Sequence, residues 1–298
     1  MPPSTFFTTP DGDVILRADQ GSGQEQDFRV HRLVLSLSSP AFKDMFELAS
    51  PDANVGQPVP VVQLADPPET IDTILKFIYP GVESPEIKDL STLATVLDVA
   101  RKYDIDSIVP ALRKSLKGFL PNQCVKVYLL GCRFGFEDEA KKAARLTTPL
   151  MLGSDDYSEE VKAVSSNDLY RLIRFTAERE LQGVSEIKWS LENALKGIEC
   201  DHADRADGFY RELTAKVTGL FASDPSFEYG ELLSLFDTIP DPPFGCAPSP
   251  HPAANFFFDH DESAFSCPLM QMSIRNTLVN LVHKLEEVND SLVKKYFG

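Results

Sequence analysis

The chain has 298 residues, of which 45 are acidic and 29 are basic, and its formal net charge at pH 7 is −16. A chain of this length is expected to form more than one domain, because single cores rarely grow beyond about 250 residues. The acidity argues against nucleic-acid and anionic-membrane partners, because each phosphate contact requires a cationic side chain.

The cysteines are few, odd in number and without a compact framework of spacings: Cys124, Cys132, Cys200, Cys246 and Cys267. This pattern favours thiols in a reducing compartment. The first 13 residues have neither the basic start nor the apolar core of a secretory signal, and no segment approaches the roughly 18 apolar residues of a membrane span. We therefore expect an intracellular protein, cytoplasmic or nuclear.

The first predicted elements are two short strands. Residues 14–16 form an apolar run, and Phe28 and Val30 alternate with Arg29 as in a half-buried strand. We expect the two strands to form a hairpin.

A short helix is predicted after the histidine that ends the second strand. Leu33, Val34 and Leu37 follow His31 at helical spacing. The apolar face of the strand is therefore expected to continue as a stripe on this helix.

A second helix is predicted to begin at a capped break. Ser39 can accept hydrogen bonds from the first amides of a helix, and Pro40 has no amide to leave unsatisfied at the first helical position. The helix then carries Phe42, Met45 and Phe46. We expect the chain to turn a tight corner here.

A third strand and three helices are predicted between residues 61 and 120. An apolar strand begins at Val61, and Asp66-Pro67-Pro68 supplies a helix start. The helix that follows has an apolar stripe and ends at Tyr79: Ile71, Ile74, Leu75 and Ile78. Two further stripes, over 90–100 and 105–116, predict a helix pair that breaks near Tyr103.

Three blocks in this order resemble the BTB/POZ domain. FRVHRLVLSLSSPAFKDMF (28–46) has the strand, the histidine followed by a basic residue, the Ser-Pro break and the Met-Phe pair. VVQLADPPETIDTILKFIYPG (61–81) is similar to the family's third strand and following helix, and LATVLDVARKYDIDSIVPALRKSLKGFL (93–120) is similar to its last helix pair. The resemblance implies an α+β fold, a small sheet plus helical hairpins, over residues 11–120.

The resemblance also implies positions that shape the fold or the interaction surface: Asp13, His31, Ser39, Phe42, Met45, Phe46, Tyr79 and Tyr103. In the family the histidine lies at the strand-to-helix corner, where an imidazole can bond backbone groups, so we assign it a structural role instead of a catalytic one. Asp13 matches the acidic residue that opens the first strand, where a corner or dimer-contact role is implied.

Three segments are expected after the BTB-like region. Residues 121–236 predict a helical extension, with helices around 169–173 and again around 189–195 and with Trp189 in the core. Residues 237–268 are rich in proline and predict an irregular linker, whose Phe256-Phe257-Phe258 run is expected to pack on the helical domain.

Residues 269–298 predict an amphipathic carboxyl-terminal helix. Its apolar seam recurs at alternating steps of four and three: Ile274, Leu278, Leu281, Leu285, Val288 and Leu292. Further valines widen the stripe beyond a strict two-stranded seam, which favours docking on the helical domain over a free coiled coil.

No catalytic or cofactor motif is present, so we expect neither an enzyme nor a bound cofactor. Six thiol and imidazole side chains could in principle supply a zinc site: Cys200, His202, Cys246, His251, His260 and Cys267. Their spacing differs from the paired ligands of structural zinc sites, so we expect no metal there.

The family resemblance implies a non-catalytic scaffold or adaptor for other proteins. It implies a homodimer built by an apolar face and, in several branches, a cullin-type scaffold as partner for ubiquitin transfer. The adaptor branch places an apolar residue and a glutamate shortly after the Met-Phe pair, whereas Glu47 and Leu48 here run directly into a proline-rich loop. The chain looks closest to the stand-alone BTB proteins of fungi.

The alternative is an enzyme whose site is assembled in the carboxyl-terminal helical half without a linear motif. Such a site would lie in a pocket lined by groups with shifted pKa values.

Overall fold

The computed structural model describes residues 7–8, 10–19, 25–49, 59–120, 122–153, 157–196, 207–224, 231–232, 234 and 268–298. The chain divides into two compact units, Met1–Glu139 and Ala140–Gly298. Within the described residues, no helix is both long and apolar enough to cross a membrane. Residues 237–267 of the proline-rich segment, with the three phenylalanines, lie outside the described residues.

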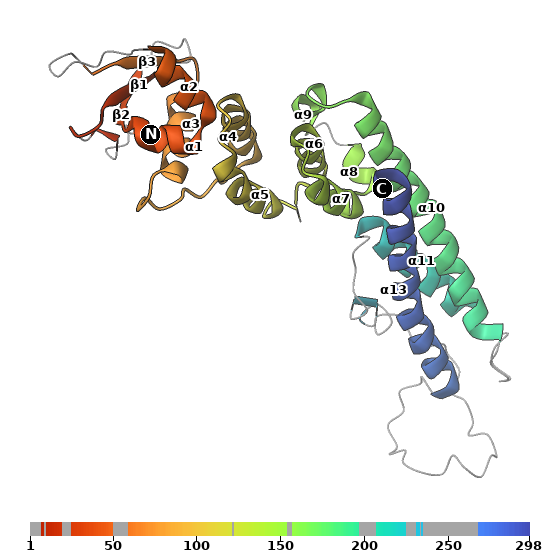
Figure 1. The fold of residues 1–298 in the computed structure, drawn as a ribbon. Coiled ribbons are helices and arrows are strands. Elements are labelled where there is room, and N and C mark those ends of the chain that lie inside the picture. Colours follow the sequence, from red (N-terminus) through yellow and green to blue (C-terminus); the bar gives the residue numbers. More distant parts are fainter. Residues whose placement is uncertain are drawn as a thin grey trace, which may run out of the picture. The chain divides into compact units, whose positions relative to one another are not determined.

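The first unit contains a three-stranded sheet in the order β2-β1-β3 (Figure 1). Strands β1 (Val14–Ala18) and β2 (Gln26–Val30) pair antiparallel, with Val14 opposite Val30. This confirms the expected hairpin. Strand β3 (Val61–Leu64) pairs with β1 in parallel. Alternate side chains of β1 and β2 are buried, so the sheet has one core face.

Helices cover this sheet and extend the unit. They are α1 (Arg32–Ser38), α2 (Pro40–Ala49), α3 (Pro68–Ile78), α4 (Leu90–Lys102), the 3₁₀ turn η2 (Asp106–Ile108), α5 (Val109–Lys117), α6 (Cys124–Phe134) and α7 (Glu137–Leu146). The predicted stripes supply the core: Ile71, Ile74 and Leu75 on α3, Leu93, Val96 and Leu97 on α4, and Leu112 and Leu116 on α5 are buried. The α+β fold class is thus confirmed.

Helix α1 corrects the expectation for its apolar stripe. Leu33 is 70% exposed and Leu37 is 80% exposed, whereas Leu35 is fully buried. Successive helical residues are rotated by about 100°, so Leu35 is turned about 200° away from Leu33 and Leu37. Burying Leu35 therefore directs both other leucines to solvent.

Glu139, on α7, is a buried carboxylate at the end of the first unit. It accepts a hydrogen bond from Arg113 Nη2 at 2.6 Å and forms an ion pair with Lys117 Nζ at 3.2 Å. Burial alone raises the pKa of Glu139, but the hydrogen bonds from Arg113, from the backbone and from Lys117 outweigh burial and lower it. The ionised carboxylate thus ties α7 to α5.

The second unit is helical. It comprises the rest of α7 and the helices α8 (Pro149–Leu152), α9 (Ser158–Lys162), α10 (Ser166–Lys196), α11 (Asp207–Ser223) and α13 (Pro268–Phe297). Helix α10 is one continuous helix of 31 residues, which joins the two stretches expected around 169–173 and 189–195.

Trp189, on α10, is 56% exposed, so the prediction that it lies in the core was wrong. Its ring instead lies 4.1 Å from the ammonium group of Lys284.

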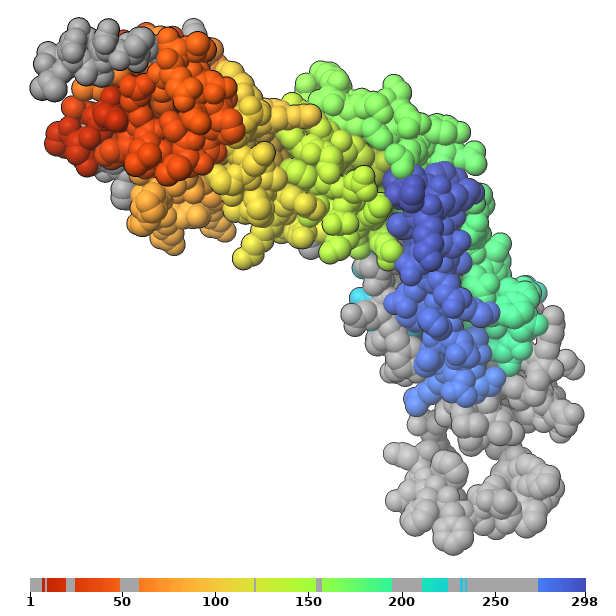
Figure 2. Space-filling view, viewed as in Figure 1, coloured from red at the N-terminus to blue at the C-terminus, as the bar shows by residue number. Residues whose placement is uncertain are grey.

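Helices α10 and α13 lie side by side, green and blue in Figure 2, and the hydrogen bonds at their two ends show that they run antiparallel. Near one end Ser273 Oγ donates to the carbonyl of Ala194 at 3.0 Å, and near the other Arg171 Nε donates to the carbonyl of Tyr296 at 2.7 Å. Most of the predicted seam of α13 is buried: Ile274, Leu278, Leu281, Leu285 and Leu292.

Helix α11 packs on another side of α10. A Cβ atom added at Gly183 would lie 2.2 Å from the ring of Phe221, so the two helices approach closely only because this residue has no side chain. Gly183 therefore serves the packing of α10 against α11.

Arg179 is a buried arginine in the middle of α10. Its guanidinium donates to the carbonyls of Arg145 at 2.6 Å, of Ala144 at 3.3 Å and of Thr147. The carbonyls of Arg145 and Thr147 lie at and just after the carboxyl end of α7, where a helix runs out of its own amide donors, and the carbonyl of Ala144 also accepts from the amide of Thr147 at 3.2 Å. Burial lowers the pKa of Arg179 to about 10, so the side chain still carries its charge at neutral pH.

Candidate protein-interaction site

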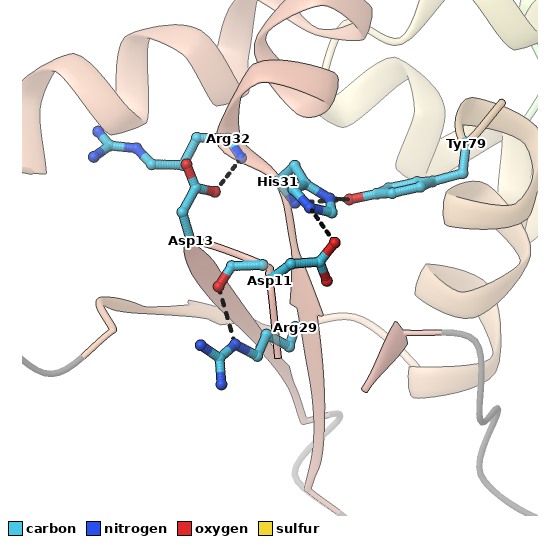
Figure 3. Close-up of polar contacts among 7 residues, drawn as sticks. Asp11, Asp13, Arg29, His31, Arg32 and Tyr79 are labelled. Atoms are coloured by element: carbon cyan, nitrogen blue, oxygen red, sulfur yellow. Dashed lines mark hydrogen bonds and ion pairs between the residues drawn. The ribbon is translucent and has the colours of Figure 1, made fainter. Parts of the chain in front are cut away.

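His31 lies at the corner between β2 and α1, and its contacts are structural (Figure 3). Its backbone amide donates to Tyr79 Oη at 2.7 Å, and its Nδ1 lies 3.2 Å from the same oxygen. Because the phenol accepts from the amide and still carries a proton, it can donate that proton to Nδ1. The other ring nitrogen, Nε2, lies 3.5 Å from Asp11 Oδ2. The side chain is about one third exposed, so the corner histidine is not in open solvent.

The phenol of Tyr79 is kept protonated by its surroundings. Burial raises its pKa, the amide of His31 opposes this rise, and the charges of Asp13 and Asp11 add to it. A neutral phenol can both accept and donate. Tyr79, just after α3, therefore fixes the strand-to-helix corner.

Asp13, the residue just before β1, caps α1. Its Oδ1 accepts a hydrogen bond from the backbone amide of Arg32 at 2.7 Å, which satisfies one free donor in the first turn of the helix.

The turn before Asp13 is held by Arg29, whose Nε donates to the carbonyl of Gly12 at 2.9 Å. A Cβ atom at Gly12 would lie within 2.8 Å of Arg29 and 2.9 Å of the backbone of Val30, so this turn requires glycine.

Arg32 connects the two helices of the corner. Its Nη2 donates to the carbonyl of Phe46 near the end of α2 at 2.6 Å, and its guanidinium lies 5.1 Å from the centre of the Phe46 ring. The first residue of α1 is thus held by Asp13 on one side and by α2 on the other.

Ser39 and Phe42 hold the start of α2 in the core. The buried Ser39 Oγ accepts from the amide of Phe42 at 3.0 Å, as predicted for a helix cap, and donates to the carbonyl of Tyr103. The ring of Phe42 stacks on the ring of Tyr103 at 4.8 Å and lies 6.0 Å from Phe46. Met45, on the same helix, is only half-buried.

The hydroxyl of Tyr103 donates to the buried carboxylate of Asp66 at 2.6 Å, which Lys102 Nζ also contacts at 2.8 Å. Burial and the negative partner both raise the pKa of Tyr103.

The eight residues singled out by the family resemblance form two groups. Asp13, His31 and Tyr79 surround the corner, while Ser39, Phe42, Phe46 and Tyr103 join α2 to α4, with Met45 at its edge.

Two exposed leucines were missed as surface features. Leu33 and Leu37 lie one helical turn apart on α1, and we call this pair the leucine face. Exposed apolar side chains that cluster on one face often mark sites of association. The sequence contains a signal for it, because three leucines at two-residue spacing cannot all face the core of a helix.

Among the described residues, no group of three or more histidine, cysteine, aspartate or glutamate side chains could hold a metal ion. The six residues considered for zinc, from Cys200 to Cys267, lie outside the described part of the chain. The shifted pKa values of Tyr79, Tyr103, Glu139 and Arg179 are each explained by hydrogen bonds or burial within the fold.

Comparison with known proteins agrees with this geometry. Residues 10–120 match the model of the BTB/POZ domain family. A search of curated proteins found no match. The matched residues include the whole sheet, the His31 corner and helices α1 to α5. Residues 10–120 of this chain are therefore a BTB/POZ domain, a module for protein–protein interaction.

Proposed function

We propose that the chain is a non-catalytic adaptor that self-associates through the leucine face of its BTB/POZ domain. The observation that carries this proposal is the exposure of Leu33 and Leu37 on a helix whose third leucine is buried. Removing two leucine side chains from water would contribute roughly 3 to 6 kcal/mol before the costs of association.

The rigidity of α1 supports this function. The helix is capped by Asp13, held to α2 through Arg32 and attached to the corner that His31 and Tyr79 fix. Binding to a face that is already ordered does not require ordering a loop, so less of the contact free energy is lost. A second copy of the chain presents the same apolar pair, as a two-fold interface requires.

The experiment is sedimentation equilibrium of the full chain over a range of concentrations. We expect the wild-type chain to approach twice its mass of 33.1 kDa. The double variant L33E/L37E should raise the dimer dissociation constant at least tenfold. Lys43→Glu, an exposed change on α2, is the control for added negative charge and should leave association unchanged. A wild-type chain that stays monomeric at 100 μM, or an L33E/L37E variant that associates as well as wild type, would refute the proposal.

Leu48 supports a narrower proposal, the recruitment of a cullin-type scaffold. It is 87% exposed near the end of α2 and follows the exposed Glu47, although the loop after it departs from the adaptor pattern. Titration of a purified cullin amino-terminal region tests this role. Leu48→Glu should abolish scaffold binding and leave self-association intact. No binding by the wild-type chain at 100 μM would refute recruitment alone.

A further inference from the structure

An apolar stripe runs along the outer face of α10. Tyr170 is 59% exposed, Ile173 is 45% exposed and Leu181 is 72% exposed, while Ala177 is exposed and Val184 is half-buried. We call these five residues the α10 stripe. At about 100° per residue, they fall within a sector of about 80°.

The stripe lies away from the faces that α10 uses within its unit. Phe175 and Glu186 contact α13, and Gly183 contacts α11. In Figure 1 α10 lies at the edge of the helical unit, with α11 and α13 on one side. The stripe is therefore additional to the apolar surface that forms the core of the unit, and its exposure is unusual for a helix that is already packed.

The order of residues along the stripe is symmetric about Ala177. Ile173 and Leu181 lie four residues to either side of it, and Tyr170 and Val184 lie seven residues to either side. We propose that the α10 stripe pairs with the same stripe of a second chain, antiparallel and about a two-fold axis at Ala177. Each large apolar side chain then meets a large apolar side chain, and alanine meets alanine, which lets the helices approach closely.

The charges beside the stripe agree with this pairing. In an antiparallel helix pair related by a two-fold axis, each edge of one helix lies beside the same edge of the other helix. Arg174 and Glu178 share one edge, so Arg174 of each chain lies near Glu178 of the other, with an offset of about 3 Å along the helix axis. Glu178 already accepts from Lys295 Nζ of its own chain at 2.6 Å, so Arg174 of the second chain would be an additional cation beside this carboxylate. On the opposite edge the two Glu180 carboxylates are offset by about 9 Å, where physiological salt screens their repulsion.

The stripe is about 21 Å long, which is short for an interface. Stable pairs usually bury about 800 Å² on each partner, so this contact alone gives a weak, concentration-dependent association. It is independent of the leucine face, because the two surfaces lie in different units.

Disulfide cross-linking in the full chain tests the pairing and its register. Ala177 lies on the proposed axis, so Ala177→Cys should form a covalent dimer on mild oxidation. Gln182→Cys, an exposed position on another side of α10, is the matched control. We expect at least fivefold more dimer from A177C than from Q182C or from wild type, which reports the background of the native cysteines.

The direction of pairing is tested by mixing two variants. Ile173→Cys mixed with Leu181→Cys should give more cross-linked dimer than either variant alone, because position 173 faces position 181 of the second chain. In A177C, adding Leu181→Glu should reduce the yield at least fivefold, while adding Q182E should not. The yield should persist in the L33E/L37E background, which separates this contact from the leucine face.

Equal yields from A177C and Q182C would overturn the pairing, whatever else covers the stripe. A higher yield from I173C alone than from the mixture would indicate parallel helices and overturn the register. All of these positions are exposed or half-buried, so the variants are expected to fold, and circular dichroism melting curves within 3 °C of wild type verify it.

Discussion

The hydroxyl of Ser39 donates a hydrogen bond to the backbone carbonyl of Tyr103, 64 residues further along the chain. The same hydroxyl accepts from the amide of Phe42 and so caps α2. One buried side chain thus joins the start of α2 to the end of α4. Ser39→Ala leaves both backbone groups without this partner and should lower the free energy of unfolding by about 1 to 3 kcal/mol, measured by urea denaturation.

The control for this change is the neighbouring Ser38→Ala, at the end of α1. Because Ser38 is only half-buried and does not cap α2, its loss should change stability by less than about 0.5 kcal/mol. Equal effects of the two variants would mean that the cap and the link to Tyr103 contribute nothing specific.

Phe42 and Met45 differ in burial, and their truncation should differ accordingly. Phe42 is 2% exposed and stacks on Tyr103, so Phe42→Ala should cost about 3 to 5 kcal/mol. Met45 is half-buried on the same helix, so Met45→Ala should cost about 1 to 2 kcal/mol. Chemical denaturation of both variants measures the two costs, and a Phe42→Ala effect below about 0.5 kcal/mol would contradict the core position.

The Glu139 ion pair predicts a specific pH dependence. The pKa of Glu139 is lowered on folding from an ordinary value of 4.5, so its ionised form stabilises the fold above pH 4.5 and this stabilisation is lost as the pH falls through the lowered value. Glu139→Gln should be less stable than wild type by about 1 to 3 kcal/mol at pH 7. The difference should shrink below pH 4.5, because protonation makes the wild-type side chain resemble glutamine.

Urea denaturation of both proteins from pH 7 to pH 3 measures this difference. Asp138→Asn is the matched control, because Asp138 is largely exposed and lies 3.7 Å from the same Arg113. It should change stability little at any pH. A constant difference between wild type and E139Q across the range would refute the role of ionised Glu139.

Arg179 should be required for the carboxyl end of α7. Arg179→Met keeps much of the apolar stem but leaves the carbonyls of Ala144, Arg145 and Thr147 without the guanidinium, at a cost of about 2 to 4 kcal/mol. Arg179→Lys keeps a charge but not the planar fork, so its cost should be intermediate. Hydrogen exchange of the amides at 144–148 should accelerate in the same order. A methionine variant as stable as wild type would show that the carbonyls find other donors.

Local sequence patterns predicted much of the BTB/POZ domain. The cap at Ser39 and the proline after it indicated where α2 begins, and alternation around Arg29 indicated β2. These features depend on residues close in sequence, which is why they could be found. The parallel pairing of β3 with β1 could not, since no residue in either strand specifies a distant neighbour.

The errors have physical reasons too. Periodicity shows that a helix has an apolar face but not whether the core lies on that side, so the spacing of Leu33 and Leu37 predicts burial although both side chains face solvent. The residue type of Trp189 favours a core position, but the side chain is 56% exposed and Lys284 contacts its ring. Arg179 was overlooked, although its spacing of four from Phe175 and seven from Leu172 places it on a buried face. The domain boundaries at 120, 236 and 268 and the binding roles of the eight family positions stay predictions.

The sheet order β2-β1-β3 has a consequence for how quickly the domain assembles. Strand β2 begins eight positions after β1 ends, so this hairpin can close on a timescale of about 1 to 10 μs. Strand β3 begins 43 positions after β1 ends, and α1 and α2 lie in between. Contacts that span many residues carry a larger loop-closure entropy and form more slowly. We therefore expect β3 to join last, so that during synthesis one edge of β1 stays open until the helical crossover is in place.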